Sequence, residues 1–444
     1  MIMSWLIENF NLFDKSIAII YRDKKYTYKE LFLEILNIEA TVLDKIESGE
    51  VVAILADYSF KSIALLLALY KNKNIIVPIA SSVSKEIDEK IKESFCTKAI
   101  KLSDGFEVIS YKVDSQHEMI TSLQMSKKSG LILFSSGSTG KPKAMVHDFD
   151  NMVEHYKNKK HKSMNMLVFL MFDHIGGINT LLNIFSIGAT MIIPQNRDAK
   201  EICRLIQEYK IRILPSSPTF LNLILMSKAD EVYDLSSLRM ITYGTEAMPE
   251  SLLLRLKKRF PKAKLLQTFG TSETGIANTS SRSSDSTYIK IDDPHLKYKI
   301  VDNELWLKSD MQILGYLNSS MDSFEDGWFK SGDLVEEMED GFIKIIGRNK
   351  EVINVGGEKV LPTEVESVIL SMPEIKDVMV YGEKNAITGQ SVVCEVVTDI
   401  DKKSIKKTIR AFCKDKIENY KIPTKVVVVD STNFSDRFKK MRIH

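Results

Sequence analysis

The sequence LILFSSGSTGKPK at residues 131–143 is the most informative part of this chain. Its first four residues form an apolar run that is typical of a buried strand, and glycine and polar residues end that run. The two glycines allow backbone N–H groups to approach an anion, while serine, threonine and lysine side chains add hydroxyl donors and positive charge. The stretch therefore predicts a strand that leads into a phosphate-binding loop.

This loop differs from the phosphate loop of kinases and GTPases, which has four residues between its glycines and a Ser or Thr after its lysine. Here Gly137 and Gly140 are closer together, and Pro142 follows the lysine. A flexible linker is the alternative interpretation of a Ser/Gly-rich segment, but its position directly behind an apolar strand favours a binding loop.

The composition is that of a globular protein with two to four structural units: 444 residues, 44% hydrophobic and 27% charged. A net charge of +2 predicts neither a nucleic-acid partner nor an anionic membrane surface. Four widely spaced cysteines indicate free or buried thiols in a reducing compartment. The first residues show no secretion signal and no apolar run approaches 20 residues, so we expect a cytoplasmic protein without integral membrane association.

Strand and helix patterns alternate along most of the chain. Residues 51–55 and 74–79 predict buried strands, and the apolar residues 59–70 between them predict a helix. The order recurs further on, with strands at 189–194 and 211–214 on either side of a helical pattern. Strands that alternate with helices predict parallel sheets covered by helices on both faces.

The pattern changes beyond about residue 285, where shorter strands predict a small, mainly β subdomain. Asp340-Gly341 indicates a β-hairpin in this region. From residue 350 onward, helices and strands of a compact α+β unit follow. Thr363 and Glu366 have the spacing of a capping box at the start of its first helix.

These patterns together predict an α/β fold in two domains. Residues 1–348 would form a large N-terminal domain of parallel-type sheets covered by helices, together with the small β subdomain. Residues 349–444 would form a small α+β C-terminal domain. No proline- or glycine-rich linker marks the boundary.

The order of residues in the serine-rich loop resembles the signature of the adenylate-forming, or AMP-binding, enzyme superfamily. This superfamily contains acyl- and aryl-CoA synthetases, luciferases and the adenylation domains of peptide synthetases, and this chain is most similar to the acyl-CoA synthetases. The family pattern ends in Pro-Lys-Gly, whereas Ala144 stands at the last position here. The resemblance implies that the loop binds the phosphates of ATP through Ser135, Ser136, Gly137, Ser138, Thr139, Gly140 and Lys143.

Residues 269–273, Phe-Gly-Thr-Ser-Glu, resemble the family element Tyr-Gly-x-Thr-Glu. The resemblance implies that Glu273, with Thr139, holds Mg²⁺ against the phosphates, and that Ser272 bonds the α-phosphate beside Phe269 and Gly270. Carboxylate, water and phosphate oxygens are the ligands that Mg²⁺ prefers. A capped turn is the alternative interpretation of this segment taken alone.

Two further elements resemble the family's nucleoside site. Gly244, Thr245 and Glu246 match the segment whose main chain lies along adenine. Residues 328–333, Trp-Phe-Lys-Ser-Gly-Asp, resemble Trp-x-x-Thr-Gly-Asp, which implies that Asp333 accepts both ribose hydroxyls and that Arg348 reaches the same sugar. An ionised carboxylate is a strong acceptor for two O–H donors. Surface salt-bridge residues are the alternative.

The C-terminal region resembles the mobile domain of the family. Lys350 occupies the hinge position, and Gly356 and Gly357 match the loop that lines the pantetheine tunnel. The closing motif Gly-Lys-x-x-Arg is matched by Phe438-Lys439-Lys440-Met441-Arg442, which gives Lys439 the contact with phosphate and substrate carboxylate. The glycine is missing, and Lys440 remains a rival for that role.

Asp173-His174-Ile175-Gly176-Gly177 resembles the element Phe-His-x-x-Gly of acyl- and aryl-CoA ligases, which implies that His174 gates the acyl pocket. A structural histidine is the alternative. In amino-acid-activating relatives an aspartate of this region pairs with the substrate amine, and Asp173 keeps that option open.

The resemblance as a whole implies an AMP-forming acid–thiol ligase that uses ATP and Mg²⁺. Such an enzyme adenylates a carboxylic acid, for instance a fatty acid, and passes the acyl group to CoA. The alternatives are transfer to the phosphopantetheine of an acyl carrier protein, activation of an amino acid, and a relative that binds ligand without turnover. The sequence does not identify the acid, the acceptor or the oligomeric state.

Overall fold

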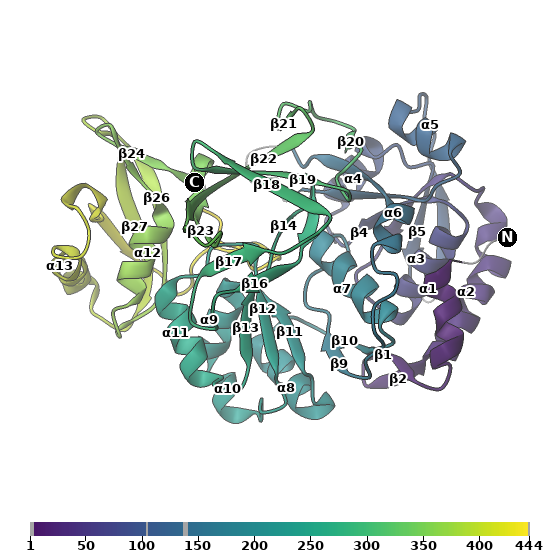
Figure 1. Cartoon of the computed structure of the whole chain (residues 1–444), viewed down its shortest axis with the longest axis horizontal. Helices are drawn as coiled ribbons and strands as arrows, with labels where there is room; N and C mark the ends of the chain where they lie inside the picture. Colours follow the sequence, from purple (N-terminus) through teal and green to yellow (C-terminus); the bar gives the residue numbers. More distant parts are fainter. Residues whose placement is uncertain (1–3, 104, 136–140, 443–444) are drawn as a thin grey trace. The chain divides into compact units, whose positions relative to one another are not determined.

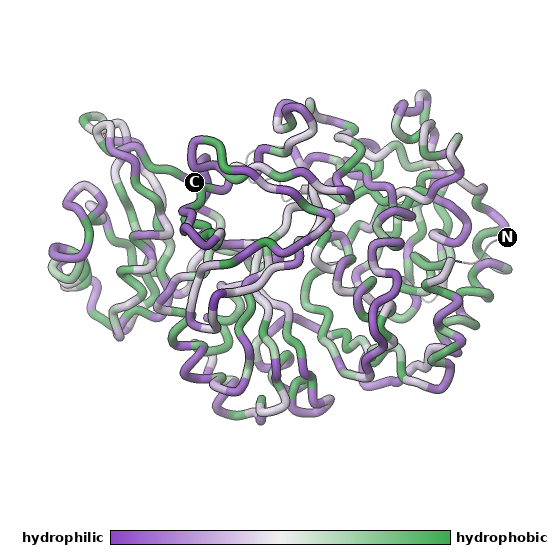
Figure 2. The backbone as a smooth tube through the Cα atoms, viewed as in Figure 1, coloured by the Kyte–Doolittle hydropathy of each residue, from purple (hydrophilic) through white to green (hydrophobic). Residues whose placement is uncertain are grey.

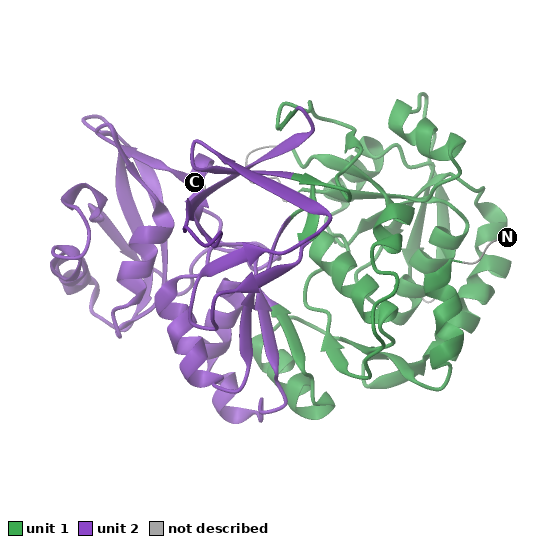
Figure 3. Ribbon diagram, viewed as in Figure 1, with its two compact units in different colours: residues 1–215, 271–276, 308–325 green, residues 216–270, 277–307, 326–444 purple. Residues whose placement is uncertain are grey.

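The computed structural model describes residues 4–103, 105–135 and 141–442, and it confirms the predicted mixed α/β architecture (Figure 1). The chain forms two compact units, coloured separately in Figure 3. Unit 1 comprises residues 1–215, 271–276 and 308–325, and unit 2 comprises residues 216–270, 277–307 and 326–444. The predicted boundary between residues 348 and 349 lies inside unit 2 and stays a prediction.

The first sheet of unit 1 carries the strand that precedes the serine-rich loop. Its strand order is β20-β8-β7-β4-β3-β5-β6. The central strands β3 (Val51–Leu55), β4 (Ile75–Ile79), β5 (Lys98–Leu102) and β7 (Gly130–Phe134) are parallel. The flanking strands β6 (Phe106–Ser110), β8 (Ala144–Asp148) and β20 (Gly315–Tyr316) run antiparallel to their neighbours.

Both faces of this sheet are covered, as the continuous apolar runs predicted. Val52 and Ile54 pack into one hydrophobic cluster, while Val51 and Ala53 pack into another. Successive side chains of a strand point to opposite faces, so a strand with two buried faces needs apolar residues at every position. Helix α3 (Phe60–Lys71) covers one face and buries nine consecutive residues from Ser62 to Tyr70.

A second group of strands in unit 1 lies in the order β11-β9-β10-β1-β2. Strands β1 (Ile17–Tyr21), β9 (Asn165–Leu167), β10 (Thr190–Ile193) and β11 (Ile213–Ser216) are parallel, and β2 (Lys24–Thr27) returns antiparallel to β1. The helices of this part include α2 (Tyr28–Thr41), α7 (Ile175–Ser186) and α8 (Ala199–Tyr209). Helix α8 alternates between hydrophobic and hydrophilic residues (Figure 2), and its four buried residues Ile202, Cys203, Leu205 and Ile206 form one face.

Unit 2 begins with an α/β part and continues with an antiparallel sheet. Strands β12 (Met240–Tyr243) and β13 (Lys264–Gln267) are parallel, and their neighbours in sequence are helices α9 (Pro218–Ser227) and α11 (Glu250–Arg259). The antiparallel sheet has the order β16-β17-β23-β22-β19-β18. Its strands are β16 (Thr279–Ser281), β17 (Tyr288–Ile291), β18 (Leu296–Val301), β19 (Glu304–Ser309), β22 (Trp328–Glu337) and β23 (Ile343–Arg348). The predicted hairpin at Asp340-Gly341 is confirmed, because these residues join β22 to β23.

The last part of unit 2 is the predicted α+β region. Strands β24 (Ile353–Val355), β25 (Glu358–Val360), β26 (Ile375–Asn385), β27 (Gly389–Thr398) and β28 (Lys425–Val428) form one sheet, with helices α12 (Pro362–Leu370) and α13 (Lys402–Cys413).

The predicted capping box of α12 is wrong. Pro362 begins the helix, and its fixed φ suits the first helical position, so Leu361 is the N-cap and Thr363 lies inside the first turn. The Thr363 hydroxyl instead donates to the Ile346 carbonyl, and the Glu366 carboxylate accepts a hydrogen bond from the Val380 N–H.

All four cysteines are buried free thiols, as the sequence predicted. In the part of the chain that the structure describes, no helix has both the length and the apolar character needed to cross a bilayer.

One buried polar group of unit 1 makes the stability of the fold depend on pH. His147 lies on β8 with 1% of its surface exposed, and neither ring nitrogen has a hydrogen-bond partner among the described residues. Burial lowers the pKa of His147 from 6.5 to about 4. The unfolded chain therefore binds one more proton than the folded chain between these pH values.

We expect the free energy of unfolding to fall as the pH is lowered from 6.5 towards 4, by on the order of 3 kcal/mol across the full window. His147→Leu should remove this contribution, whereas His161→Leu, at an exposed position, should keep the wild-type dependence. Urea titrations at a series of pH values measure the effect. Parallel curves for wild type and His147→Leu would contradict a neutral, buried His147.

Candidate functional site

The ends of the serine-rich loop are tied together in unit 1. The Ser135 N–H donates to the Lys143 carbonyl at 3.0 Å, and the Lys143 N–H donates to Ser135 Oγ at 2.9 Å. The Asn318 side chain bonds both sides of Lys143, accepting from the Ala144 N–H at 2.9 Å and donating to the Pro142 carbonyl at 3.0 Å. The predicted phosphate ligands Ser136, Gly137, Ser138, Thr139 and Gly140 lie outside the described residues.

A tyrosine that the sequence did not single out connects two predicted site residues of unit 1. The Tyr316 hydroxyl donates to Glu273 Oε1 at 3.1 Å, and Lys143 Nζ lies 4.7 Å from the centre of the Tyr316 ring. Burial, and then the charge of Glu273, raise the pKa of Tyr316, so the hydroxyl remains a donor. Tyr316 reaches this place because β20 pairs with β8, a long-range contact for which the sequence has no local signal.

Glu273 lies in a tight turn that fits both interpretations of its segment. Thr271 Oγ1 accepts a hydrogen bond from the Thr274 N–H at 3.1 Å, so the turn is capped, and Ser272 and Glu273 stand within it. Among the described residues, no three His, Cys, Asp or Glu side chains gather to hold a metal. A lone carboxylate still fits Mg²⁺, which commonly takes one or two carboxylates and completes its shell with water and phosphate oxygens.

His174 has a structural role at the start of α7. It is the N-cap residue, and its Nδ1 accepts a hydrogen bond from the Gly176 N–H at 2.9 Å. A Cβ atom on Gly177 would lie 2.1 Å from the Met171 carbonyl oxygen, and one on Gly176 would lie 2.4 Å from Leu170. Packing against backbone therefore requires glycine at position 177, while at position 176 the Leu170 side chain would have to move. The gating role of His174 stays a prediction.

Asp173 faces a buried lysine of α4 (Ser84–Glu93). The carboxylate is nearly buried, and its Oδ2 lies 3.8 Å from Lys90 Nζ. Lys90 is also buried and pairs with Glu86 at 2.6 Å. The positive charge opposite Asp173 thus belongs to the protein itself.

Unit 2 contains a pocket that collects most of the predicted nucleoside-site residues. Predicted site residues that line it are Gly244, Thr245, Glu246, Phe269, Gly270, Asp333, Arg348 and Lys439. They come from the segments that follow β12 and β13, from the neighbouring strands β22 and β23, and from the C-terminal tail. Residues from separate parts of the sequence therefore meet at one pocket.

The main chain that enters this pocket after β12 is tightly constrained. A Cβ atom on Gly244 would lie 2.8 Å from the Thr268 carbonyl oxygen, so only glycine allows this approach. Thr245 has a φ of 72°, which is rare for a β-branched residue and indicates local strain at the pocket wall. The Glu246 carboxylate accepts hydrogen bonds from two backbone N–H groups, of Thr219 at 2.7 Å and of Lys440 at 3.2 Å.

Asp333 and Arg348 form a cross-strand pair on the pocket wall. They stand opposite each other on β22 and β23, and Arg348 Nε donates to Asp333 Oδ1 at 2.9 Å. Asp333 is only 5% exposed, and its own N–H donates to Ser331 Oγ at 3.0 Å. A carboxylate offers about four acceptor sites, so one donor from Arg348 leaves capacity for a diol.

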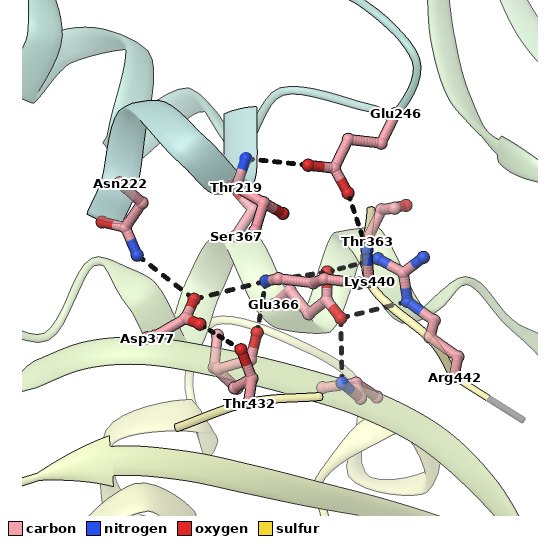
Figure 4. Close-up of polar contacts among 12 residues, drawn as sticks. Thr219, Asn222, Glu246, Thr363, Glu366, Ser367, Asp377, Thr432, Lys440 and Arg442 are labelled. Atoms are coloured by element: carbon pink, nitrogen blue, oxygen red, sulfur yellow. Dashed lines mark hydrogen bonds and ion pairs between the residues drawn. The ribbon is translucent and has the colours of Figure 1, made fainter. Parts of the chain in front are cut away.

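The structure separates the two adjacent lysines of the tail. Lys439 lines the pocket, where burial and then the charge of Arg348 lower its pKa to about 8. Lys440 is turned to the carboxylates of the C-terminal region, with its Nζ 3.4 Å from Asp377 Oδ1 and 4.0 Å from Glu366 Oε2 (Figure 4). Its ammonium group also donates to the Val378 carbonyl.

Arg442 anchors the end of the tail beside Lys440. Its guanidinium donates to both oxygens of Glu366, at 3.2 and 2.8 Å (Figure 4). It also donates to Glu351 at 3.0 Å. Glu366 is 2% exposed, and a buried carboxylate needs such partners to remain ionised.

The predicted hinge and pantetheine residues are not among those that line the pocket. Lys350 lies in a short 3₁₀ turn, Asn349–Glu351, where burial and then Arg348 lower its pKa. Gly356 and Gly357 have φ values of 62° and 97° and form the turn between β24 and β25. Two consecutive left-handed residues suit a tight hairpin, which explains both glycines structurally.

Comparisons with known proteins agree with the geometry. Residues 8–317 match the family of AMP-binding enzymes, and residues 364–435 match the AMP-binding enzyme C-terminal domain. The chain is 30% identical to the 2-succinylbenzoate–CoA ligase of Bacillus licheniformis over 339 residues, which cover 70% of this chain and 68% of that protein.

Solved structures of CoA ligases share the fold. The anthranilate CoA ligase AuaEII in complex with anthranoyl-AMP has a TM-score of 0.83 at 17% identity, covering 100% of this chain and 96% of the other. The o-succinylbenzoate coenzyme A synthetase of Bacillus subtilis, in complex with ATP and magnesium ion, has a TM-score of 0.78 at 21% identity, covering 99% and 98%.

These findings define the class as an acyl-CoA-synthetase-like ligase of the AMP-forming type. The chain belongs to the family of AMP-binding enzymes, the wider group that contains this class, which confirms the resemblance seen in the serine-rich loop and the later motifs.

Gly177→Ala should destabilise the fold by about 1–3 kcal/mol, because the new methyl group overlaps the Met171 carbonyl and the backbone must shift. Gly105→Ala is the matched control, since a Cβ atom there meets no atom of the described residues within 4 Å. Denaturant midpoints measure both changes. Equal midpoints for the two variants would show that α7 tolerates a side chain at this approach.

Proposed function

We propose that this protein is an ATP-dependent acid–thiol ligase that adenylates a carboxylic acid and transfers the acyl group to CoA. The observation that carries the proposal is the pocket of unit 2, which places a paired, buried carboxylate and a lysine of lowered pKa beside Gly244 and Thr245. A nucleotide offers the matching groups, namely a ribose diol, phosphate anions and a flat base.

The nucleoside is assigned to the groups of unit 2. Asp333 accepts the ribose hydroxyls while Arg348 holds the carboxylate in place, and the main chain at Gly244 and Thr245 supports adenine beside Phe269. Because Arg348 fixes Asp333 before any ligand arrives, little reorganisation accompanies binding. Lys439 supplies positive charge for the phosphates and for the carboxylate of the acid.

The phosphates are assigned to the loop of unit 1. Ser135 and Lys143 close this loop, and Ser272 adds a hydroxyl donor near Glu273. Glu273, oriented by Tyr316, would hold Mg²⁺ together with Thr139. A bound Mg²⁺ neutralises charge on the phosphate oxygens and orients them.

The reaction then needs no protein nucleophile. A carboxylate oxygen of the acid attacks the α-phosphorus of ATP, and pyrophosphate leaves as the new P–O bond forms. The thiol of CoA next attacks the acyl carbon, its proton passes to solvent, and AMP leaves. The protein contributes positioning and charge stabilisation in both steps. We assign the change between the steps to rotation of residues 349–444 about Lys350, which would bring Gly356 and Gly357 to the pantetheine arm.

The substrates of related ligases and the surroundings of Asp173 together favour an aromatic acid without an amino-acid amine as the substrate. 2-Succinylbenzoate and anthranilate are aromatic acids, so aryl acids are the first candidates and a fatty acid is the comparison. Lys90 supplies the positive charge opposite Asp173, which disfavours recognition of a substrate amine and hence amino-acid activation. A carrier protein remains the alternative acceptor to CoA.

The proposal predicts that the protein exchanges labelled pyrophosphate into ATP only in the presence of a suitable acid. 2-Succinylbenzoate, anthranilate, benzoate, octanoate and phenylalanine form the panel, and CoA is then compared with a phosphopantetheinylated carrier protein as acceptor. ATP binding without exchange for any acid would favour a relative that binds nucleotide without turnover.

Asp333→Ala should bind ATP roughly ten- to a few-hundred-fold more weakly, since losing the hydrogen bonds between ribose and this carboxylate costs about 1.5–3 kcal/mol in total.

The lowered pKa of Lys439 predicts a pH dependence of adenylation. Lys439 is protonated below its pKa of about 8 and loses its charge above it, so kcat/KM for ATP should fall as the pH rises through this value. Lys439→Arg should lower the rate but abolish this fall, because arginine stays charged. Lys359→Arg, at an exposed position, is the control and should keep the wild-type profile. A profile for Lys439→Arg that still falls near pH 8 would assign the titration to another group.

A further inference from the structure

The residue before Lys439 has an unusual backbone conformation. Phe438 has a φ of 51°, in the left-handed region that glycine adopts freely and that other residues rarely occupy. Such a conformation costs about 1–3 kcal/mol and persists only where surrounding contacts hold it. The contacts of Phe438 are therefore expected to offset this cost.

Three of these contacts join Phe438 to helix α9 and to the turn of the tail itself. The Phe438 ring lies edge-on to Phe220 of α9, with centroids 4.9 Å apart, and stacks on Phe434 at 5.7 Å. The Phe438 carbonyl accepts a hydrogen bond at 2.8 Å from the hydroxyl of Ser217, the N-cap residue of α9. Ser217 and Phe220 are both buried, so the ring and the carbonyl are held by a rigid surface.

The residue after Lys439 is anchored as well. The Lys440 N–H donates to Glu246, and its ammonium group is held by Asp377 and the Val378 carbonyl. Asp377 in turn accepts a hydrogen bond from Asn222 of α9 at 3.2 Å. Lys439 thus stands between two neighbours that are both tied, directly or through one side chain, to the same helix.

We infer that Phe438 is a positioning residue whose ring, docked on Phe220 of α9, fixes Lys439 in the pocket for the adenylation step. This inference rests on the proposed function, because it concerns how the pocket lysine of that reaction is held. The contact between the Phe438 and Phe220 rings, and not a flexible backbone, fixes the path of the main chain at residue 438. A glycine at position 438 would adopt the same φ without strain, yet it would leave Lys439 without this anchor.

The variants separate the ring from the backbone conformation. Phe438→Gly and Phe438→Asn both tolerate a left-handed φ but lack the ring, whereas Phe438→Tyr keeps the ring. Met441→Ala is the matched control in the same tail, since the Met441 side chain is 46% exposed. Two measurements are made on the full chain: amide hydrogen exchange of the tail, and the two half-reactions assayed separately with the acid that gives the fastest pyrophosphate exchange.

For Phe438→Gly and Phe438→Asn we expect the tail amides of Phe438 and Met441, which donate to Ser435 and Asn433, to exchange at least about tenfold faster. The kcat of pyrophosphate exchange should fall by about tenfold to a hundredfold, as expected for a misplaced group. Thioester formation from supplied acyl-adenylate should stay within about twofold of wild type, and Phe438→Tyr should resemble wild type in every assay.

Two results would overturn the inference: tail amides in Phe438→Gly as protected as in Met441→Ala, or equal loss of both half-reactions at an unchanged melting temperature. Failure of the proposed function is recognised separately, because wild type would then catalyse no exchange with any acid. In that event the amide exchange rates alone decide whether the ring anchors the tail.

Discussion

A buried carboxylate, Glu366 of α12, determines how the C-terminal end of the chain is placed. Removing a carboxylate from water is costly, and burial alone would raise its pKa. Arg442 and Lys440 more than compensate, so the pKa of Glu366 lies below its usual range and the group remains ionised. The carboxylate therefore requires both cations nearby, and since these flank the tail residue Met441, the tail has little freedom to lie elsewhere.

This requirement links the core of the C-terminal region to the pocket. Glu366 also accepts a hydrogen bond from Val380 of β26, so one side chain joins α12, the sheet and the tail. Lys439 lies in the pocket because its two neighbours are held in place: Phe438 by Ser217 and Phe220, and Lys440 by Glu246 and Asp377. If the tail were only a basic segment exposed to solvent, no such contacts would hold it. There would then be no reason for Lys439 to face the pocket while the adjacent Lys440 pairs with buried carboxylates.

Much of the fold could be predicted from the sequence because its strongest signals are local. The apolar runs at residues 51–55 and 74–79 need two covered faces and therefore predict a parallel sheet between helices, as the structure shows. The nucleoside-site segments could likewise be found as motifs, and the structure brings Gly244, Asp333, Arg348 and Lys439 to one pocket.

What could not be predicted depends on contacts between distant residues. Tyr316 meets Glu273 only through strand pairing, and neither residue has a local feature that indicates the other. The capping box failed for a local reason instead, because Pro362 begins α12 and makes Leu361 the N-cap, and Glu366 is free to bond Arg442 and Val380. The left-handed backbone of Phe438 could not be predicted from the residues around it either, because contacts with α9 impose that conformation.

The electrostatics of the pocket suggest why its tail must be held so firmly. Burial and then the charge of Arg348 lower the pKa of Lys439, while Glu351, Asp333 and Glu246 act in the opposite direction. The net effect is a lowered pKa, so a charged lysine is less favourable at this place than in water until an anion arrives. A free tail would remove this cost by moving Lys439 into water. The contacts of Phe438, Lys440 and Arg442 prevent that movement. The positive charge of Lys439 is thereby kept in the pocket, where it stabilises a bound phosphate or carboxylate most strongly.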